Sequence, residues 1–248
     1  MSSPEATVVA AHLRVIAIDG PAAAGKSTVA REIADRLGAL LFDTGALYRV
    51  IALLALRTGA DPDDAHALCK LAEETDIRFR PPSVADDRLY DVLIGSEDVT
   101  WRIRDPDVGA IVSPVAAHAS VRAALLPVQR RIAAAGPVVM VGRDIGTVVV
   151  PDAGLKIFLD ASPEERARRR YAESRQRQQD VSLADVERET AARDAIDSAR
   201  ATAPLRPADD AVRVETDNLD IDAVVVVILD LARGLRDANG DPVWPRLS

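Results

Sequence analysis

The chain has 248 residues, a net charge of −8 and a hydrophobic content of 48%, which is ordinary for a folded domain with a sizeable core. The acidic balance argues against a nucleic-acid polymer as partner, because such a partner needs a broad basic field. No stretch reaches the roughly 18 apolar residues of a membrane span, no signal peptide is recognisable, and the lone Cys69 has no partner for an internal disulfide. We therefore expect a cytoplasmic protein that binds neither a membrane nor a nucleic acid.

The first informative feature is a loop between a predicted strand and a predicted helix. Residues 15–18 are apolar and partly β-branched, which indicates a buried strand at 14–18, and residues 27–37 have the apolar spacing of a helix. The loop between them fits the G-x-x-x-x-G-K-[ST] phosphate-binding pattern with Gly20, Pro21, Ala22, Ala23, Ala24, Gly25, Lys26 and Ser27. In this context backbone N–H groups surround phosphate oxygens, Lys26 reaches the β- and γ-phosphates, and the Ser27 hydroxyl coordinates Mg²⁺.

The remaining elements alternate between apolar strands and helices. Further strands are expected at 39–42, 88–94, 137–141, 155–159 and 211–215, and further helices at 45–58, 63–75, 119–134, 182–200 and 220–234. Another helix is expected to begin at a capping box at Ser162 and to run through Arg170. This alternation predicts a parallel sheet covered on both faces. The stretches 60–115 and 161–205 look like appended lobes, and we expect a loose tail at 1–12 and a disordered one at 235–248.

Two segments outside the loop carry candidate binding residues where predicted strands end. In 43–49, Thr44 is placed to cap a helix and Arg49 lies one turn in; a capped surface helix is the plainer alternative. In 141–149, Arg143 and Asp144 follow an apolar strand at the edge where open α/β sheets bind ligands. A buried ion pair is the alternative for this second segment.

A third segment lies near the end of the predicted 182–200 helix. Arg193, Asp197 and Arg200 are spaced i, i+4 and i+7, so they share one helix face. A solvated face laced by salt bridges would have the same pattern, and the sequence leaves both interpretations open.

Taken together, these segments resemble the bacterial cytidylate kinase family over about residues 14–234. The shared motifs occur in the family's order, and the most specific are G-R-D-I-G-T-V-V at 142–149 and R-D-x-x-D-S-x-R at 193–200. The resemblance implies a P-loop NTPase fold, a three-layer α/β/α structure with a parallel central sheet. It also implies one kinase domain over 13–234, divided into a core at 13–43, 136–160 and 206–234, a monophosphate-binding lobe at about 44–135 and a helical lid at about 161–205.

The resemblance also implies roles for individual residues. The loop, continued by Thr28, would hold the ATP phosphates, and Ser27 would bind Mg²⁺. The residues acting on the transferring phosphoryl group would be Lys26, Arg143, Arg166, Arg170 and Arg193. The acceptor would be held by Thr44, Arg49, Ser113, Arg122, Arg143, Asp144, Arg193, Asp197 and Arg200, with Ser113, Arg122 and Asp144 recognising cytosine. The chain departs from many relatives at Ala23, where glycine or serine is common, and at Val141, where some relatives have a carboxylate.

The implied activity is transfer of the γ-phosphoryl group of ATP to CMP, and to dCMP, by a monomer in pyrimidine nucleotide metabolism. One alternative is a P-loop kinase of another small acceptor, such as a different nucleotide or shikimate. Another is a nucleotide-dependent ATPase switch, since residues 156–160 superficially resemble a Walker B strand. We expect Asp160 to end a strand instead, because a capped helix follows it.

Overall fold

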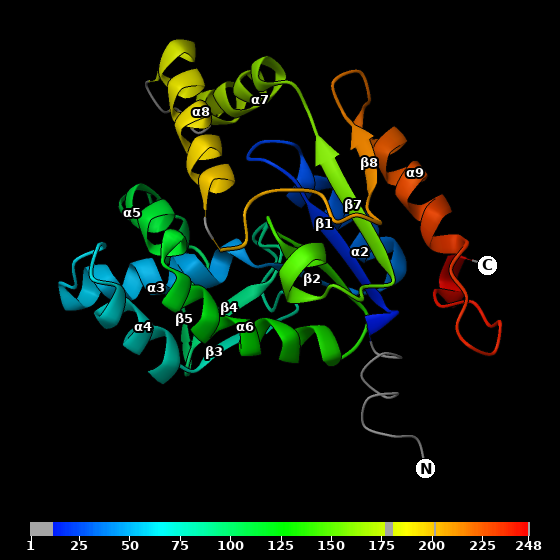
Figure 1. The fold of residues 1–248 in the computed structure, drawn as a ribbon, viewed down its shortest axis with the longest axis horizontal. Coiled ribbons are helices and arrows are strands. Elements are labelled where there is room, and N and C mark those ends of the chain that lie inside the picture. The colour runs from blue at the N-terminus through cyan, green and yellow to red at the C-terminus, as the bar shows by residue number, and fades with distance from the viewer. Residues whose placement is uncertain (1–11, 177–180, 201, 248) are drawn as a thin grey trace.

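The computed structural model describes residues 12–176, 181–200 and 202–247, and its centre is a five-stranded parallel sheet (Figure 1). The strands are β1 (Val15–Asp19), β2 (Leu40–Asp43), β6 (Val138–Val141), β7 (Leu155–Asp160) and β8 (Val212–Glu215). Their order across the sheet is β2-β6-β1-β7-β8. The central strand β1 is fully buried, as its apolar sequence predicts, and Ala17 pairs with Met140 on one side and Lys156 on the other.

Helices flank this sheet and complete the predicted three-layer α/β/α fold of P-loop NTPases. Helix α2 (Lys26–Leu37) follows β1 and packs against α9 (Ile221–Arg233), whereas α6 (Ala119–Ala134) contacts β6. Gly38 ends α2 in the left-handed conformation that favours glycine, with φ 61°. The Asp220 side chain caps α9 by accepting a hydrogen bond from the Ala223 amide.

A long insert lies between β2 and β6. It contains α3 (Gly45–Thr58), α4 (Ala65–Glu74), the antiparallel strands β3 (Ile77–Arg80), β4 (Asp91–Ile94) and β5 (Glu97–Asp98), the short helix η1 (Arg102–Arg104) and α5 (Pro106–Ala117). The predicted strand 88–94 begins later than expected, and α5 was not predicted. Aromatic rings join this insert to the main sheet, since Phe79 contacts Phe42 at 4.7 Å and Tyr90 at 5.6 Å between centroids.

Two helices stand beyond the carboxyl end of β7, where Figure 1 shows them side by side. They are α7 (Pro163–Gln176) and α8 (Leu183–Ala199), and the predicted N-terminal cap of α7 is confirmed. The Ser162 hydroxyl accepts from the Glu165 amide at 3.3 Å, and the Ser182 hydroxyl accepts from the Asp185 amide at 3.1 Å.

The expectation of a disordered C-terminal tail was wrong for residues 235–247. Trp244 is only 3% exposed and joins the main hydrophobic core with Val243, and the short helix η3 (Pro245–Leu247) contacts α2 and α9. Burial of an indole supplies the apolar area that holds this proline-containing segment in place. The tail predicted at 1–12 lies almost wholly outside the described residues; of it, His12 is buried and bonds to Asp152.

Within the described residues, no single helix is long and apolar enough to cross a membrane. Helices α5 and α6 reach the required length and composition only when taken together, and they meet at 97°.

Candidate functional site

The phosphate-binding loop has the backbone that the motif requires. Gly25 adopts φ 87°, and Ala23 is one of few non-glycine residues with a positive φ, at 59°. Lys26 begins α2 and its ammonium donates to the Pro21 carbonyl at 2.6 Å, so the side chain folds back over the loop. Burial, reinforced by the nearby Arg143, lowers the pKa of Lys26 well below its usual range.

One cavity of about 590 Å³ collects most of the predicted residues. It is bounded by the loop, α3, α5, the turn after β6, α7 and α8. The predicted residues that line it are Ala22, Ala23, Lys26, Ser27, Thr44, Arg49, Ser113, Arg122, Arg143, Asp144, Arg170, Arg193, Asp197 and Arg200. Segments more than a hundred residues apart in sequence therefore meet at one site, at the carboxyl edge of the sheet.

The middle of this cavity is strongly cationic. Burial lowers the pKa of Arg193 to about 10, and the positive charges of Arg143, Arg49 and Arg170 act in the same direction. Among the described residues, the Arg193 guanidinium has no hydrogen-bonding or ion-pair partner, while Arg49 donates to the Ile103 carbonyl at 3.2 Å. Such a group of partly desolvated guanidinium ions is suited to bind a multiply charged anion.

Asp197 forms ion pairs with two of the cations in this cavity. Its carboxylate accepts from Arg143 Nε at 2.8 Å through one oxygen and pairs with Arg200 through the other. Burial alone would raise the pKa of Asp197, but the charges of Arg143 and Arg200 outweigh burial and lower it. The sequence left open that Arg193, Asp197 and Arg200 form a solvated helix face. This alternative is wrong, because Asp197 is only 2% exposed.

A second ion pair closes the other end of the cavity. Arg122 Nη2 donates to Asp144 Oδ2 at 2.5 Å, and both side chains are 7% exposed. The Arg122 guanidinium also lies over the Tyr48 ring, 5.3 Å from its centroid. This part of the cavity therefore combines a carboxylate, a guanidinium and an aromatic ring, and Ser113 also lines the cavity.

The turn between β2 and α3 differs from its prediction. Thr44 was expected to cap α3, but its hydroxyl donates to the Val141 carbonyl at 3.0 Å, and Asp43 instead accepts from the Gly45 amide. The other Asp43 oxygen lies 3.4 Å from the Ser27 hydroxyl. No cluster of three or more metal-binding side chains occurs in residues 12–176, 181–200 and 202–247.

Arg166 does not line the cavity. It is 5% exposed and donates to Asp194 on α8 at 2.5 Å, to the Ala161 carbonyl at 3.0 Å and to the Ala22 carbonyl of the loop at 3.4 Å. In this arrangement its guanidinium ties α7 and α8 to the phosphate-binding loop.

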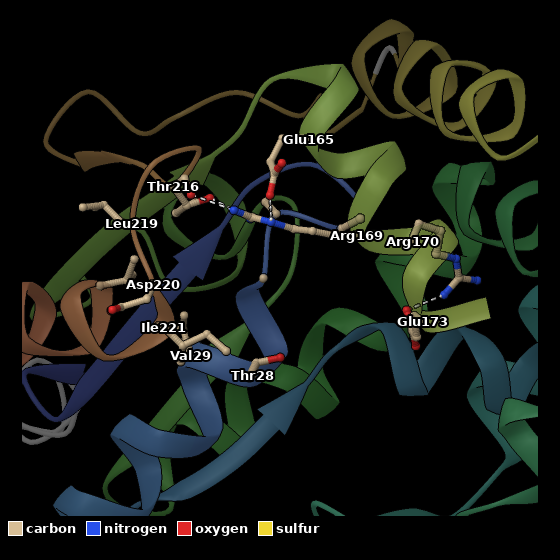
Figure 2. A pocket seen from close by; sticks show the side chains of 14 residues that line it. Thr28, Val29, Glu165, Arg169, Arg170, Glu173, Thr216, Leu219, Asp220 and Ile221 are labelled. Carbon is tan, nitrogen blue, oxygen red and sulfur yellow. Dashed lines mark hydrogen bonds and ion pairs between the residues drawn. The ribbon is translucent and has the colours of Figure 1, made fainter. Parts of the chain in front are cut away.

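A second cavity, of about 560 Å³, lies on the other side of the loop, and Figure 2 shows it from close by. Ala24, Gly25 and Thr28 line it, and Arg169 crosses it by donating to Glu165 and to the Thr216 hydroxyl and carbonyl. Its outer wall is apolar and comes from the chain after β8, with Leu219, Ile221 and Val224. Sequence reasoning missed this wall, although its position after a strand end was a usable signal.

The two cavities meet beside the loop. Ala23, Arg170 and Glu173 line both of them, and Figure 2 shows Arg170 bonded to Glu173. Tyr90 and Arg104, also missed by sequence reasoning, reach the larger cavity from the insert. The Arg104 guanidinium lies over the rings of Tyr90 and Trp101, at 5.7 and 5.6 Å from their centroids.

Comparison with known proteins identifies the family of this chain. The family model described as cytidylate kinase matches residues 16–234. A protein named cytidylate kinase from Chloroflexus aggregans is 50% identical over 88% of this chain and 93% of its own length. Another of that name from Herpetosiphon aurantiacus is 48% identical over 87% and 93%. A bifunctional pantoate ligase/cytidylate kinase from a Synechococcus strain is 45% identical over 93% of this chain and 46% of its own length. The chain thus belongs to the cytidylate kinase family.

Proposed function

We propose that the protein transfers the γ-phosphoryl group of ATP to CMP, and to dCMP, forming ADP and CDP or dCDP. The observation that carries this proposal is the meeting of two cavities at the phosphate-binding loop, with Arg170 on the wall of both. Two nucleotides bound in these cavities would bring their phosphates together beside Lys26. A reaction between two bound substrates needs this convergence, because holding the reactants in place removes much of the entropic barrier.

The smaller cavity is suited to the nucleoside part of ATP. It opens beside the loop and the amino-terminal end of α2, so phosphates on the loop would lead directly into it. Its apolar wall of Leu219, Ile221 and Val224 offers a surface for a base, and the Arg169 side chain crosses it near the loop.

The larger cavity is suited to the acceptor. Arg49, Arg143 and Arg193 would hold the 5′-phosphate, since planar guanidinium groups bind phosphate in bidentate fashion. Asp197 and Arg200 would contact the sugar. At the far end Asp144, with Arg122 and Ser113, would recognise cytosine, because a carboxylate accepts a hydrogen bond from the 4-amino group. Uracil presents a carbonyl there, and a buried anion facing a carbonyl is how such sites discriminate steeply.

Catalysis in this proposal is electrostatic. The attacking oxygen belongs to a phosphate that is ionised near neutral pH, so no side chain has to act as a general base. Charge developing on the transferred group would be stabilised by Lys26, Arg143, Arg170 and Arg193. The lowered pKa values of Lys26 and Arg193 reflect buried cations that repel one another, and phosphate between them would offset that repulsion.

The residues beside the loop also fit Mg²⁺. Mg²⁺ prefers oxygen ligands and is commonly held by one or two protein groups together with substrate phosphates. The Ser27 hydroxyl and the Asp43 carboxylate provide such a pair at 3.4 Å from each other, whereas Val141 offers no ligand. When bound, the ion would neutralise phosphate charge, and Ser27 and Asp43 would hold it at the loop.

Helices α7 and α8 are suited to act as a lid over the transferring group. Arg166 joins both helices to the loop, and Arg143 joins α8 to the turn after β6. Closure would exclude water, which would otherwise compete as the phosphoryl acceptor. Four expectations stay predictions from the sequence: the lid at 161–205, the monophosphate-binding lobe at 44–135, the monomeric state and the cytoplasmic location.

A single coupled assay tests the proposal. ADP formation from ATP and Mg²⁺ is measured with CMP, dCMP, UMP or AMP as acceptor, and free phosphate is measured without any acceptor. We expect fast ADP formation with CMP and dCMP and little phosphate release in their absence. Faster turnover with another acceptor would assign a different kinase, and acceptor-independent phosphate release would favour an ATPase switch.

A further inference from the structure

One buried carboxylate joins the two halves of the site. Asp19 ends β1 directly before Gly20 of the phosphate-binding loop, and it is 4% exposed. Its Oδ1 accepts from the Ile145 amide and its Oδ2 from the Gly146 amide, both at 2.8 Å. These amides begin the short helix η2 (Ile145–Val149), whose first residues follow Arg143 and Asp144 without a break.

The surroundings leave η2 no other way to satisfy these amides. Ile145 is 0% exposed, and the stem of Lys156 packs so closely against Gly146 that a Cβ there would lie 3.1 Å from it. At the far end of η2, Arg130 donates to the Val149 and Val148 carbonyls. The helix is therefore held by a carboxylate at its amino end and by a guanidinium at its carboxyl end, as its dipole favours.

We propose that Asp19 is a positioning residue for acceptor recognition: by holding the Ile145 and Gly146 amides it fixes Arg143 and Asp144 relative to the phosphate-binding loop. It does not touch the reacting groups itself. The inference rests on the proposed function, because it assumes that Arg143 binds the acceptor phosphate and that Asp144 recognises the base.

This positioning role requires the Asp19 carboxylate to be ionised. Each oxygen accepts one hydrogen bond, and protonation would turn one of them into a donor that faces an amide N–H. Burial raises the pKa of Asp19 to about 6, although the two amide hydrogen bonds lower it. The charged groups around it are Asp144, which raises the pKa, and Lys26 from α2, which lowers it. Lys156 from β7 lies beyond Gly146, with its ammonium bound to Asp210.

The wild-type enzyme gives the first test, through the pH dependence of kcat/KM for CMP between about pH 5 and 8. The second ionisation of a phosphate monoester also lies near pH 6, so CMP alone would cause a fall of one log unit per pH unit on the acid side. Protonation of Asp19 should weaken CMP binding further, by about tenfold in total, so we expect the slope to exceed one near pH 6 before it returns to one at lower pH. A slope that never exceeds one would overturn the inference.

The second test is Asp19→Asn, a nearly isosteric change that can accept only one of the two amide hydrogen bonds. We expect KM for CMP to rise about tenfold, the preference for CMP over UMP to fall, and KM for ATP to change less than about twofold. At acid pH, kcat/KM of this variant should fall only with the slope that the ionisation of CMP itself causes. Asp152→Asn is the matched control. Asp152 lies in the turn after η2, its one side-chain partner among the described residues is His12, and the change should leave all these values as in wild type.

The outcomes separate this inference from the proposed function. Wild type that does not phosphorylate CMP would refute the proposed function. Active wild type with an Asp19→Asn variant that matches Asp152→Asn, or that raises both KM values equally, would refute only the positioning role. If Asp19→Asn does not fold, the pH dependence of kcat/KM for the wild-type enzyme decides.

Discussion

Arg143 donates through Nε to Asp197 Oδ2 at 2.8 Å, and this ion pair joins the turn after β6 to helix α8. The Asp197 side chain is 3% exposed and the Arg143 side chain 19%, so the pair is far better shielded than a surface salt bridge. The arginine that we propose to bind the acceptor phosphate is thereby oriented by a residue of the proposed lid. Acceptor binding and the position of α8 should consequently depend on each other.

Replacing Asp197 tests this dependence. In Asp197→Asn an amide oxygen can still accept one hydrogen bond, but Arg143 and Arg200 lose their shared negative charge. We expect KM for CMP to rise about tenfold, with KM for ATP nearly unchanged, because the loss falls on the acceptor side. Steady-state kinetics with each substrate varied in turn measures this. The exposed Asp209 supplies the control, Asp209→Asn, and equal increases in both KM values would contradict the prediction.

Lys26 should matter most for turnover. Its ammonium is the one cation on the loop itself, and Lys26→Ala removes charge stabilisation that grows as the phosphoryl group is transferred. We expect kcat to fall about 10³-fold or more, with the fold retained. Lys70→Ala, which removes a lysine that is 65% exposed on α4, should be fully active. A Lys26→Ala variant with a tenth of wild-type activity would show that the lysine has another role.

Base selectivity should depend on Asp144. The change Asp144→Asn keeps a hydrogen-bond acceptor for Arg122, so the buried guanidinium is not left without a partner. It also adds an N–H group that can donate a hydrogen bond to a uracil carbonyl. We expect the ratio of kcat/KM values for CMP and UMP to fall by about tenfold or more. Parallel assays with both acceptors measure the ratio. A ratio that stays at the wild-type value would remove Asp144 from base recognition.

The Mg²⁺ proposal predicts a specific defect in Asp43→Asn. An amide oxygen can still accept the Gly45 amide hydrogen bond, so the turn should keep its shape, whereas the negative charge beside Ser27 is lost. We expect the Mg²⁺ concentration for half-maximal activity to rise about tenfold, because Mg²⁺ binds carboxylates better than amides. Activity titrated with Mg²⁺ at saturating ATP and CMP measures it. An unchanged Mg²⁺ requirement would leave Asp43 only its role in the turn.

The sequence predicted best where one local pattern determines the structure. The loop from Gly20 to Ser27 and the helix starts at Ser162 and Ser182 depend on neighbours within a few residues, and the structure confirms all three. The convergence of Arg49, Arg143 and Arg193 came instead from the family resemblance. No periodicity in the sequence states that these distant side chains share a cavity.

The features that sequence reasoning missed depend on partners that are remote in the chain. Thr44 has the residue type of a helix cap, but the adjacent strand offers the Val141 carbonyl to its hydroxyl, and the Asp43 carboxylate accepts the Gly45 amide instead. Asp19 reads as the end of an apolar strand, and only the fold brings it to the Ile145 amide, 126 residues away. Local preference is a weak guide where tertiary contacts compete for the same groups.

The C-terminal segment should contribute to stability and not to catalysis. Trp244 lies beyond the residues that match the family model, yet it is 3% exposed and packs into the core near α2 and α9. We expect Trp244→Ala to lower the free energy of unfolding by about 3 kcal/mol, since truncating a buried indole leaves a cavity. Urea denaturation measures this change, and kcat of the folded variant should match wild type. Trp101→Ala is the stability control, because Trp101 is 45% exposed and should cost about 1 kcal/mol or less. Equal losses from the two tryptophans would contradict a stabilising role for the buried Trp244.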